Sequence, residues 1–438
     1  MDYLVIGLGI TGISTVKTLS KMGLNVYAYD SNISSKEDEP EELKDIKYTL
    51  IFDLEEAISK DIICVKSPGI PPHNELIQKI SNRGIEIVSD LEMAYRLFGD
   101  RNLISITGTN GKTTTTMLVN HILNESGKSS IAIGNIGVGM LWEIYSNPEI
   151  DYFVIESSSF QLDSTTTFRT KVAAFTNISP DHSDWHGSFD VYFKAKQNIF
   201  KNQKPDDKLI LNIDDKRLRK LKNEIKSEII STSLEDKNAL FYYDKPFIYR
   251  GGKRIIDARK LRIPGLHNVQ NVLVAAAITN ALNISDEDIE RACYSFNAVE
   301  HRIEFVRELN KVKFYNDSKG TNMDSTIKAL SSFENPIILI AGGYDKKVSF
   351  KEMFEQYGDR IKKLILMGET ATQMREEAKG VRDINIVKDM KEAVELSYKV
   401  MDKGDVVLLS PACASWGMYK NYMDRGNEFK DLVNNLGD

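Results

Sequence analysis

The sequence predicts an α/β protein of three domains, and three observations lead to this fold class. Short β-branched runs alternate with helical stretches along the chain, which is typical of parallel sheets with crossover helices. At 438 residues the chain is longer than one ordinary hydrophobic core can organise. Two glycine-rich loops each follow such a run and precede a helical stretch. We therefore expect a Rossmann-like domain at 1–93, a P-loop ATPase-like domain at 94–298 and a Rossmann-like domain at 299–438.

The elements of each domain are predicted from short apolar runs, which are typical of buried parallel strands. In the first domain the expected strands are 2–6, 25–30, 61–69 and 85–90. In the second domain they are 102–108, 151–157 and 171–179, and a helix is expected at 267–282. In the third domain they are 311–318, 336–343, 363–369 and 405–412.

Composition argues against several classes of protein. The formal net charge is -6, whereas proteins that bind nucleic acid usually carry a basic surface, so we expect no nucleic-acid partner. The apolar run within residues 1–10 is short and follows an acid, so we expect neither a signal peptide nor a membrane span. Cys64, Cys293 and Cys413 are odd in number and far apart, which fits neither disulfides nor a CxxC metal site. We expect a cytoplasmic monomer.

The first glycine-rich loop is "GLGITG", which contains Gly7, Gly9 and Gly12. Asp30 ends the next expected strand, about where a dinucleotide-binding fold places the acid that binds ribose. Taken alone, this pattern favours NAD, but another nucleotide diphosphate would fit the same loop. A third alternative is that the glycines only allow a helix to pack closely on a strand.

The second glycine-rich loop is "SITGTNGKTTTT" at 105–116, which resembles a P-loop that lacks its first glycine. Gly111, Lys112 and Thr113 match the end of the P-loop pattern, while Ile106 stands where that glycine is expected. Backbone N–H groups from Gly108 to Thr113 could still surround a phosphate at a helix N-terminus. Lys112 would then reach the terminal phosphates and Thr113 a magnesium ion.

Two further residues of the second domain are candidate metal ligands. Glu156 ends an expected strand, where α/β sheets place groups that contact ligands. His182 follows another strand, but imidazole is an unusual ligand for Mg2+, so a role in stabilising a turn stays open.

Seven motifs occur in the order found in the Mur ligase family, and the chain resembles this family over nearly its whole length. They are "GTNGKTTT" at 108–115, "GNIG" at 134–137, "ESSSFQL" at 156–162, "HNVQN" at 267–271, "EHRIE" at 300–304, "NDSKGTN" at 316–322 and "LLSPACAS" at 408–415. The shortened P-loop is the usual form in this family. The motifs "NDSKGTN" and "SPACAS" are similar to those of the members that add D-glutamate.

The resemblance implies a reaction and an ATP site. ATP would phosphorylate the carboxylate of UDP-N-acetylmuramoyl-L-alanine, and the amine of D-glutamate would then attack the acyl phosphate. Lys112 would contact the β- and γ-phosphates. The residues that the resemblance assigns to ATP are Gly108, Thr109, Asn110, Gly111, Lys112, Thr113, Thr114, Asn268, Arg302 and Asp317.

The resemblance also implies the metal ions and changes the ligand of the first glycine-rich loop. Thr113 and Glu156 would hold the Mg2+ of ATP, and His182 would hold a second Mg2+. Lys196 matches a lysine that is carbamylated in this family and would support that second ion, although an exposed surface lysine is the alternative. The first loop would bind the uridine diphosphate of the substrate in place of NAD. The residues assigned to this substrate are Gly9, Thr11, Asp30, Ser31, Ser67, Pro68, Gly69, Asn135 and Ser158.

D-Glutamate is expected to bind the third domain. A pair of lysines with hydroxyl groups suits a small molecule with two carboxylates. The alternative for Lys346 is a solvated surface pair with its neighbour, and the alternative for Tyr422 is an ordinary place in the core. The residues that the resemblance assigns to D-glutamate are Lys319, Thr321, Lys346, Ser415 and Tyr422.

Overall fold

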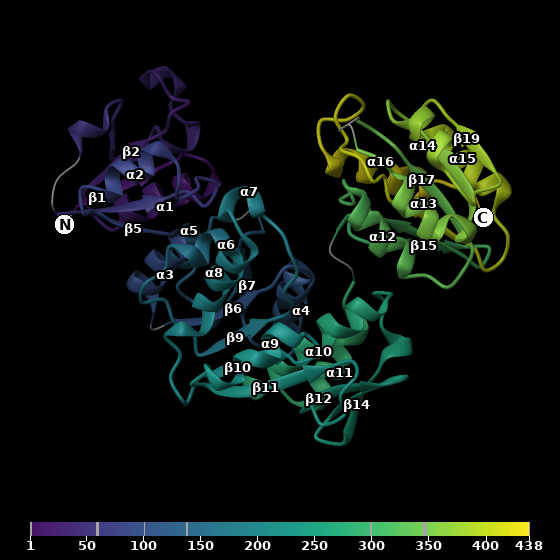
Figure 1. Cartoon of the computed structure of the whole chain (residues 1–438), viewed down its shortest axis with the longest axis horizontal. Helices are drawn as coiled ribbons and strands as arrows, with labels where there is room; N and C mark the ends of the chain where they lie inside the picture. The colour runs from purple at the N-terminus through teal and green to yellow at the C-terminus, as the bar shows by residue number, and fades with distance from the viewer. Residues whose placement is uncertain are drawn as a thin grey trace. The chain divides into compact units, whose positions relative to one another are not determined.

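The fold is that of a computed structural model, which describes residues 2–57, 61–99, 101–136, 139–297, 300–344 and 348–437. The chain divides into two compact units: the first is Met1–Arg259 with Val269–Cys293, and the second is Lys260–Asn268 with Tyr294–Asp438. Three sheets organise these units, two in the first unit and one in the second (Figure 1). The α/β fold class is therefore confirmed. Within the described ranges, no helix is long and apolar enough to cross a membrane.

The first sheet is parallel throughout, with the strand order β3-β2-β1-β4-β5 that is typical of Rossmann-like domains. Its strands are β1 (Asp2–Ile6), β2 (Val26–Tyr29), β3 (Thr49–Leu50), β4 (Ile62–Lys66) and β5 (Glu86–Val88). Helix α1 (Ile10–Lys21) buries Val16 and Leu19 with one set of sheet residues. Helix α2 (Glu75–Ser81) buries Ile77 and Ile80 with the other set. The two helices thus cover opposite faces of the sheet.

The second sheet has the order β14-β13-β12-β11-β10-β9-β6-β8-β7, so β6 lies inside it. Its strands are β6 (Asn102–Thr107), β7 (Ser130–Gly134), β8 (Tyr152–Glu156), β9 (Val172–Phe175), β10 (Lys208–Asn212), β11 (Glu228–Ser233), β12 (Phe241–Asp244), β13 (Phe247–Arg250) and β14 (Lys253–Asp257). The helices are α4 (Lys112–Glu125), α5 (Met140–Ser146), α6 (Ser159–Asp163), α7 (Ser183–His186), α8 (Phe189–Lys201), α9 (Lys216–Lys220), α10 (Leu266–Ala281) and α11 (Asp286–Ser295). The expected parallel pairing holds from β7 to β12, but β12, β13 and β14 form an antiparallel edge.

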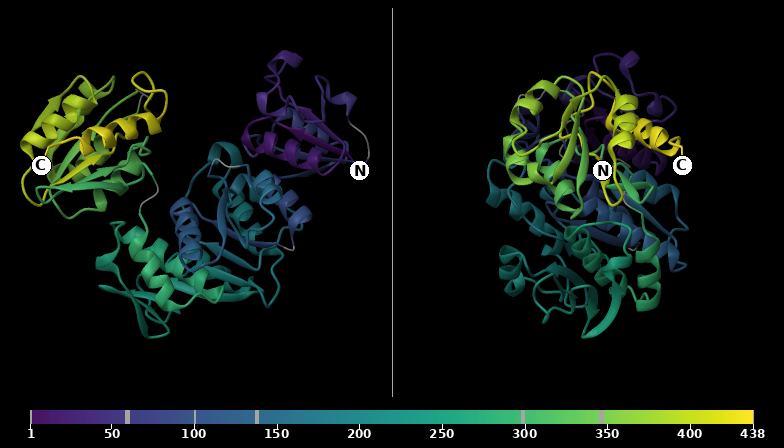
Figure 2. Two further views of the ribbon diagram at one scale, coloured as in Figure 1. Left: turned by 180° about the vertical axis from the view of Figure 1, so that it is seen from behind. Right: turned by 90° about the vertical axis from the view of Figure 1, so that its right-hand side faces the viewer.

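The second unit contains a sheet of order β15-β16-β20-β17-β18-β19, in which only β15 is antiparallel. Its strands are β15 (Glu304–Leu309), β16 (Val312–Asn316), β17 (Ile337–Ala341), β18 (Ile361–Leu366), β19 (Ile384–Ile386) and β20 (Val406–Leu409). The helices are α12 (Met323–Ser331), α13 (Lys351–Tyr357), α14 (Ala371–Glu377), α15 (Met390–Val400) and α16 (Tyr422–Asn434). The first three pack on one face of the sheet, and α15 and α16 pack on the other (Figure 2).

Helix α3 (Asp90–Phe98) links the first sheet to the second, and the predicted domain boundary at residue 93 falls inside it. Its first residue contacts α6, since the Asp90 carboxylate accepts hydrogen bonds from Gln161 Nε2 at 3.0 and 3.1 Å. Just before it, the Ser89 N–H donates to the Ser164 carbonyl at 3.0 Å. These contacts fasten the start of α3 to the second sheet's domain, while Arg96 near its end pairs with Glu86 of β5 in the first sheet. The predicted boundary at 298 lies outside the described residues.

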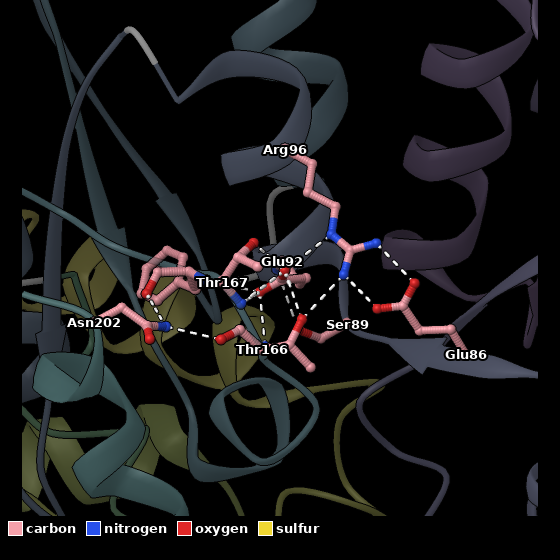
Figure 3. Close-up of polar contacts among 8 residues, drawn as sticks. Glu86, Ser89, Glu92, Arg96, Thr166, Thr167 and Asn202 are labelled. Atoms are coloured by element: carbon pink, nitrogen blue, oxygen red, sulfur yellow. Dashed lines mark hydrogen bonds and ion pairs between the residues drawn. The ribbon is translucent and has the colours of Figure 1, made fainter.

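Glu92 is the centre of the polar network that holds α3 in place (Figure 3). Its fully buried carboxylate accepts hydrogen bonds from the backbone N–H groups of Thr166, Thr167 and Phe168 at 2.9–3.0 Å. Arg96 Nε donates to the same carboxylate at 2.9 Å. Burial alone would raise the pKa of Glu92, but the hydrogen bonds from the Thr167 hydroxyl, these backbone groups and Arg96 outweigh it and lower the pKa to about 2.

We predict that Glu92→Gln lowers the free energy of unfolding of the first unit by about 2–3 kcal/mol at pH 7, because a buried charged network loses its acceptor. Since the folded pKa lies below the ordinary value of 4.5, this stabilisation is present above pH 4.5. It disappears as the pH falls towards 2, so the two proteins should converge there. Denaturant unfolding followed by fluorescence across this pH range measures the difference.

The matched control is Glu86→Gln, which removes the second carboxylate partner of Arg96. Glu86 is 43% exposed, so this change should cost less than about 1 kcal/mol. Equal costs for the two variants would show that burial of the Glu92 carboxylate is not what matters.

Candidate active site

The phosphate loop, residues 108–111, lies between the carboxyl end of β6 and the N-terminus of α4. Two of its residues must be glycine. Gly108 has a φ of 150°, and a Cβ there would lie 2.0 Å from Thr176 Oγ1. Gly111 has a φ of 80°, and a Cβ there would lie 2.3 Å from Asn271 Oδ1. The loop is therefore at the edge of a parallel sheet where ligands bind, with its backbone close to neighbouring groups.

The phosphate loop is held by the segment that follows β9. Thr109 N–H donates to the Asn177 carbonyl at 3.0 Å, and Asn110 N–H donates to Asn177 Oδ1 at 2.9 Å. In the other direction, Thr176 Oγ1 donates to the Asn110 carbonyl at 2.8 Å. These bonds fix the loop before any ligand binds.

Two lysine side chains converge on one oxygen of this loop, the Gly108 carbonyl. Lys112 Nζ donates to it at 2.9 Å and Lys196 Nζ donates to it at 2.8 Å. Lys196 is only 1% exposed, so it is not the surface lysine that the sequence left as an alternative. Burial, and then the charge of Lys112, lower the pKa of Lys196 well below its ordinary range. In the described part of the chain, no carboxylate lies within 4.0 Å of the Lys196 ammonium.

Glu156 ends β8 next to the phosphate loop and is 2% exposed. Its Oε1 accepts a hydrogen bond from Asn135 Nδ2 at 3.0 Å. Glu156, predicted to bind magnesium, thus contacts Asn135, predicted to bind the UDP substrate. Its Oε2 is buried and has no hydrogen-bond partner among the described residues. A buried carboxylate oxygen without a partner is costly unless a cation compensates it, so this oxygen fits a hard metal ion.

Two further predicted residues, His182 and Ser158, lie in the segments that follow β9 and β8. His182 has a φ of 49° and a half-exposed ring, whose Nε2 lies 3.4 Å from Asp181 Oδ2. Its ring contacts Phe160, with 4.8 Å between centroids. Ser158 is the N-cap of α6, because its Oγ accepts a hydrogen bond from Gln161 N–H at 3.2 Å. Among the described residues, no group of three or more His, Cys, Asp and Glu side chains could hold a metal ion.

The residues predicted to bind the uridine diphosphate lie in the loops that follow β1, β2 and β4, except Thr11, which lies in the first turn of α1. Asp30 Oδ2 accepts a hydrogen bond from the Leu8 N–H at 2.6 Å, and its Oδ1 accepts one from the Asn32 N–H at 2.9 Å. Gly12 must be a glycine, because a Cβ there would lie 1.8 Å from the Gly7 carbonyl oxygen. In the same loops, a Cβ at Gly7 would lie 2.8 Å from Ser67 Cβ. The sheet thus brings the three loops to one edge.

In the second unit, Asp317 follows β16 and is 4% exposed. Its carboxylate accepts hydrogen bonds from Ser410 Oγ at 2.7 Å and from the Ile303 N–H at 3.2 Å. Burial raises the pKa of Asp317 to about 7, although the Ser410 hydrogen bond and the charge of Arg302 act in the opposite direction.

The residues predicted to bind D-glutamate lie in three segments of the second unit. Lys319 Nζ lies 5.6 Å from the centre of the Tyr422 ring, so the structure brings these two together. Ser415 is buried in the loop after β20, and Thr321 follows Lys319 by two residues. Lys346 lies outside the described residues.

Asn268, predicted to bind ATP, donates to the Pro264 carbonyl at 2.6 Å in the first turn of α10.

Known proteins match the whole length of the chain. Family models match residues 106–279 (Mur ligase middle domain), 301–413 (Mur ligase, glutamate ligase domain) and 1–89 (Mur ligase MurD-like, N-terminal domain). The UDP-N-acetylmuramoylalanine--D-glutamate ligase of Clostridioides difficile (strain 630) is 42% identical over 443 residues, which cover 99% of this chain and 98% of that protein. The chain belongs to the Mur ligase family.

Other comparisons agree. The ligase of the same name from Caldanaerobacter subterraneus subsp. tengcongensis is 40% identical to this Mur ligase over 99% of this chain and 98% of that protein. The solved UDP-N-acetylmuramate-alanine ligase of Thermotoga maritima has a TM-score of 0.60 at 18% identity, over 99% of both chains. A MurF ligase of Thermotoga maritima in complex with ADP has a TM-score of 0.57 at 17% identity, over 85% of this chain and 89% of that one. The structures show the fold alone, while the sequence relatives confirm the predicted family.

Sequence reasoning missed two buried residues of this Mur ligase that hold the loops of its second unit. Arg425 is 1% exposed and donates to the carbonyls of Ser318 at 2.9 Å and Cys413 at 3.2 Å. The ring nitrogen Nδ1 of His301 lies 2.9 Å from Asn316 Nδ2. His301 belongs to the motif "EHRIE", but only Arg302 of this motif was predicted to have a role. No sequence pattern connected Arg425 with the loops that it joins.

We predict that the free energy of unfolding of the wild type falls as the pH rises from 4 to 7. The variant Asp317→Asn should not show this fall. The folded pKa of Asp317 is raised to about 7. The protonated carboxyl group therefore stabilises the wild type fully below the ordinary pKa of 3.8, and this contribution is lost as the pH rises through 7. Between pH 4 and pH 7 the free energy of unfolding of the wild type should fall relative to that of the variant by about 2–4 kcal/mol. Above pH 7 the two curves should run parallel.

Denaturant unfolding of the second unit at a series of pH values measures this difference. Asp424→Asn, at an exposed position of α16, is the control and should leave the wild-type pH dependence in place. A constant difference between the wild type and Asp317→Asn from pH 4 to pH 8 would contradict the raised pKa.

Proposed function

We propose that this Mur ligase joins D-glutamate to UDP-N-acetylmuramoyl-L-alanine in an ATP-dependent reaction of peptidoglycan precursor synthesis. The observation that carries the proposal is the similarity, over 99% of the chain, to relatives named for this ligase activity. The chemistry of the site is consistent with it. Joining a carboxylate to an amine in water is uphill, and a phosphate loop beside a carboxylate oxygen that lacks a partner suits activation of the substrate by ATP.

We assign the phosphoryl transfer to the first unit. Lys112 is at the N-terminus of α4, where it can turn from the loop carbonyls to the β- and γ-phosphates of ATP. Thr113 and Glu156 would hold Mg2+ through hydroxyl and carboxylate oxygens, the ligands that this ion prefers. When bound, Mg2+ supplies positive charge beside the phosphate oxygens as the acyl phosphate forms. His182 fits less well, because a half-exposed imidazole is a weak ligand for a hard ion, and we propose it only for a second Mg2+.

We assign the uridine diphosphate to the loops of the first sheet. The loop residues Gly9, Asp30, Ser31, Ser67, Pro68 and Gly69 follow the carboxyl ends of β1, β2 and β4, and Thr11 lies in the first turn of α1. Asn135 and Ser158 would face the muramoyl part, since both lie near Glu156 at the end of β8: Asn135 follows β7 and donates to the Glu156 carboxylate, and Ser158 comes two residues after Glu156. The domains proposed for this division of labour are 1–93, 94–298 and 299–438.

We assign D-glutamate, and part of the ATP site, to the third domain. Lys319 and Lys346 would pair with the two carboxylates, and the hydroxyl groups of Thr321, Ser415 and Tyr422 would complete the site. Arg302 and Asp317 of this domain would position ATP, together with Asn268 of the proposed domain 94–298. We also propose a monomer in the cytoplasm, since all three cysteines are free thiols, which a reducing compartment preserves.

Lys196 is proposed to be carbamylated by CO2. Carbamylation needs a neutral amine, and burial beside Lys112 favours the neutral form. The N–CO2− group formed would turn a buried cation into an anion, which could pair with Lys112 and offer oxygen atoms to a metal ion.

The proposed function is tested by phosphate release. The expected result is release of phosphate from ATP only when both UDP-N-acetylmuramoyl-L-alanine and D-glutamate are present, with L-glutamate as the matched control. Release that is indifferent to D-glutamate would favour a simple ATPase. A change in nicotinamide absorbance would favour the dinucleotide enzyme that the loop "GLGITG" alone suggests.

We predict that Lys196→Arg lowers the ligase kcat by about 100-fold or more, the scale expected when a group that supports a metal is lost. Arginine keeps the positive charge but cannot form a carbamate. Lys194→Arg, two residues earlier on α8, is the matched control and should stay within twofold of the wild type. Carbon-13 NMR with labelled bicarbonate should show a carbamate signal in the wild type and the control, and none in Lys196→Arg. An active Lys196→Arg enzyme would rule out the carbamate.

A further inference from the structure

Tyr192 is a buried residue of α8 that no motif singled out. It is 1% exposed and lies four residues before Lys196, so the two side chains share one face of the helix. Its hydroxyl oxygen lies 3.0 Å from Thr109 Oγ1, which belongs to the phosphate loop. A side chain on α8 thus reaches a loop that precedes it by 83 residues.

The Thr109 hydroxyl is part of a small hydrogen-bond network. It accepts a hydrogen bond from the Ser179 N–H at 3.0 Å, and the Ser179 carbonyl lies 3.1 Å from it. Either hydroxyl can be the donor in the contact between Thr109 and Tyr192. Burial raises the pKa of Tyr192 to about 12, so the phenol is protonated at neutral pH.

The ring of Tyr192 contacts two other residues of the proposed site. Lys196 Nζ lies 4.9 Å from the ring centre, so the ring packs against the end of this side chain. The His182 ring packs edge-on against it, with 6.0 Å between centroids. A phenylalanine would fill the same space, but it could not form a hydrogen bond with the phosphate loop.

We propose that Tyr192 is a positioning residue: its hydroxyl fixes Thr109 of the phosphate loop, and its ring fixes Lys196 and His182 relative to that loop. The roles of Lys196 and His182 rest on the proposed function, whereas the contact with the phosphate loop concerns nucleotide binding alone. Calorimetry with a magnesium complex of a non-hydrolysable ATP analogue can therefore test the hydroxyl even if the ligase reaction is misassigned.

The first variant is Tyr192→Phe. We expect the affinity for the ATP analogue to fall, and the KM for ATP to rise, by about 3- to 10-fold, the range that one hydrogen bond gives. The affinity for UDP-N-acetylmuramoyl-L-alanine and kcat should stay within about twofold to threefold. Tyr145→Phe is the matched control, because it removes another tyrosine hydrogen bond of the first unit, from Tyr145 to the Lys21 carbonyl. An unchanged affinity for the analogue, or an equal loss for both ligands, would overturn the proposal.

The second test is a double-mutant cycle with Thr109→Val. If Tyr192 acts through the Thr109 hydroxyl, adding Tyr192→Phe to Thr109→Val should change the affinity for the analogue by less than about twofold. Additive effects would show that Tyr192 does not act through the Thr109 hydroxyl and would refute this part of the inference.

The ring is tested with Tyr192→Leu, which removes the contacts with Lys196 and His182 as well. We expect kcat to fall at least about 10-fold below that of Tyr192→Phe, together with a weaker carbamate signal in carbon-13 NMR. Equal kcat values for the two variants, with both proteins folded by circular dichroism, would show that the ring has no positioning role.

Discussion

Two lysine side chains share one carbonyl oxygen, that of Gly108, and the arrangement of the proposed active site depends on this contact. Lys112 and Lys196 donate to it at 2.9 and 2.8 Å, so the two amino groups lie close together. Burial and the charge of Lys112 lower the pKa of Lys196 and favour its neutral form, because a carbonyl dipole would offset only part of the repulsion between two charges. The proposed ligands add negative charge at this place, as a phosphate at Lys112 or as a carbamate at Lys196.

The sheet edge explains how these groups meet. β6 lies between β8 and β9, so the phosphate loop after β6, Glu156 at the end of β8 and the segment after β9 emerge side by side. The residues after β9 then fix the loop through Asn177 and Ser179. Parallel pairing therefore brings together residues from distant parts of the chain, and the loop bonds set their separation. Groups held this way need little reorganisation when charge develops, which is the condition for electrostatic stabilisation of a transition state.

Much of the fold and of the candidate site could be predicted from the sequence, wherever the pattern lies within a few consecutive residues. The strands β1, β6, β8 and β17 are mostly apolar and largely buried, and all four were expected. Among the missed strands, β12, β13 and β15 mix polar and apolar residues near the edges of their sheets, whereas β10 is a buried apolar run that was not singled out. The phosphate loop could be predicted because glycine, lysine and threonine occur at fixed spacing. Tyr192 and Arg425 could not, because their partners Thr109 and Ser318 lie 83 and 107 residues away.

Arg425 and Lys196 are both buried basic residues, and comparing them shows which kind of buried group is a candidate for function. Arg425 is as buried as Lys196, but its guanidinium donates to the Ser318 hydroxyl and to the Ser318 and Cys413 carbonyls. Those acceptors satisfy a planar fork of donors, so Arg425 joins two loops and needs no ligand. Lys196 has the Gly108 carbonyl, a long contact with the Thr107 hydroxyl and a neighbouring like charge. Burial is common to both residues, and so burial alone cannot mark a site. What separates them is the size of the effect: burial lowers the pKa of Arg425 only to about 10, so it keeps its charge at neutral pH, whereas burial and the charge of Lys112 lower the pKa of Lys196 well below its ordinary range and favour the neutral amine.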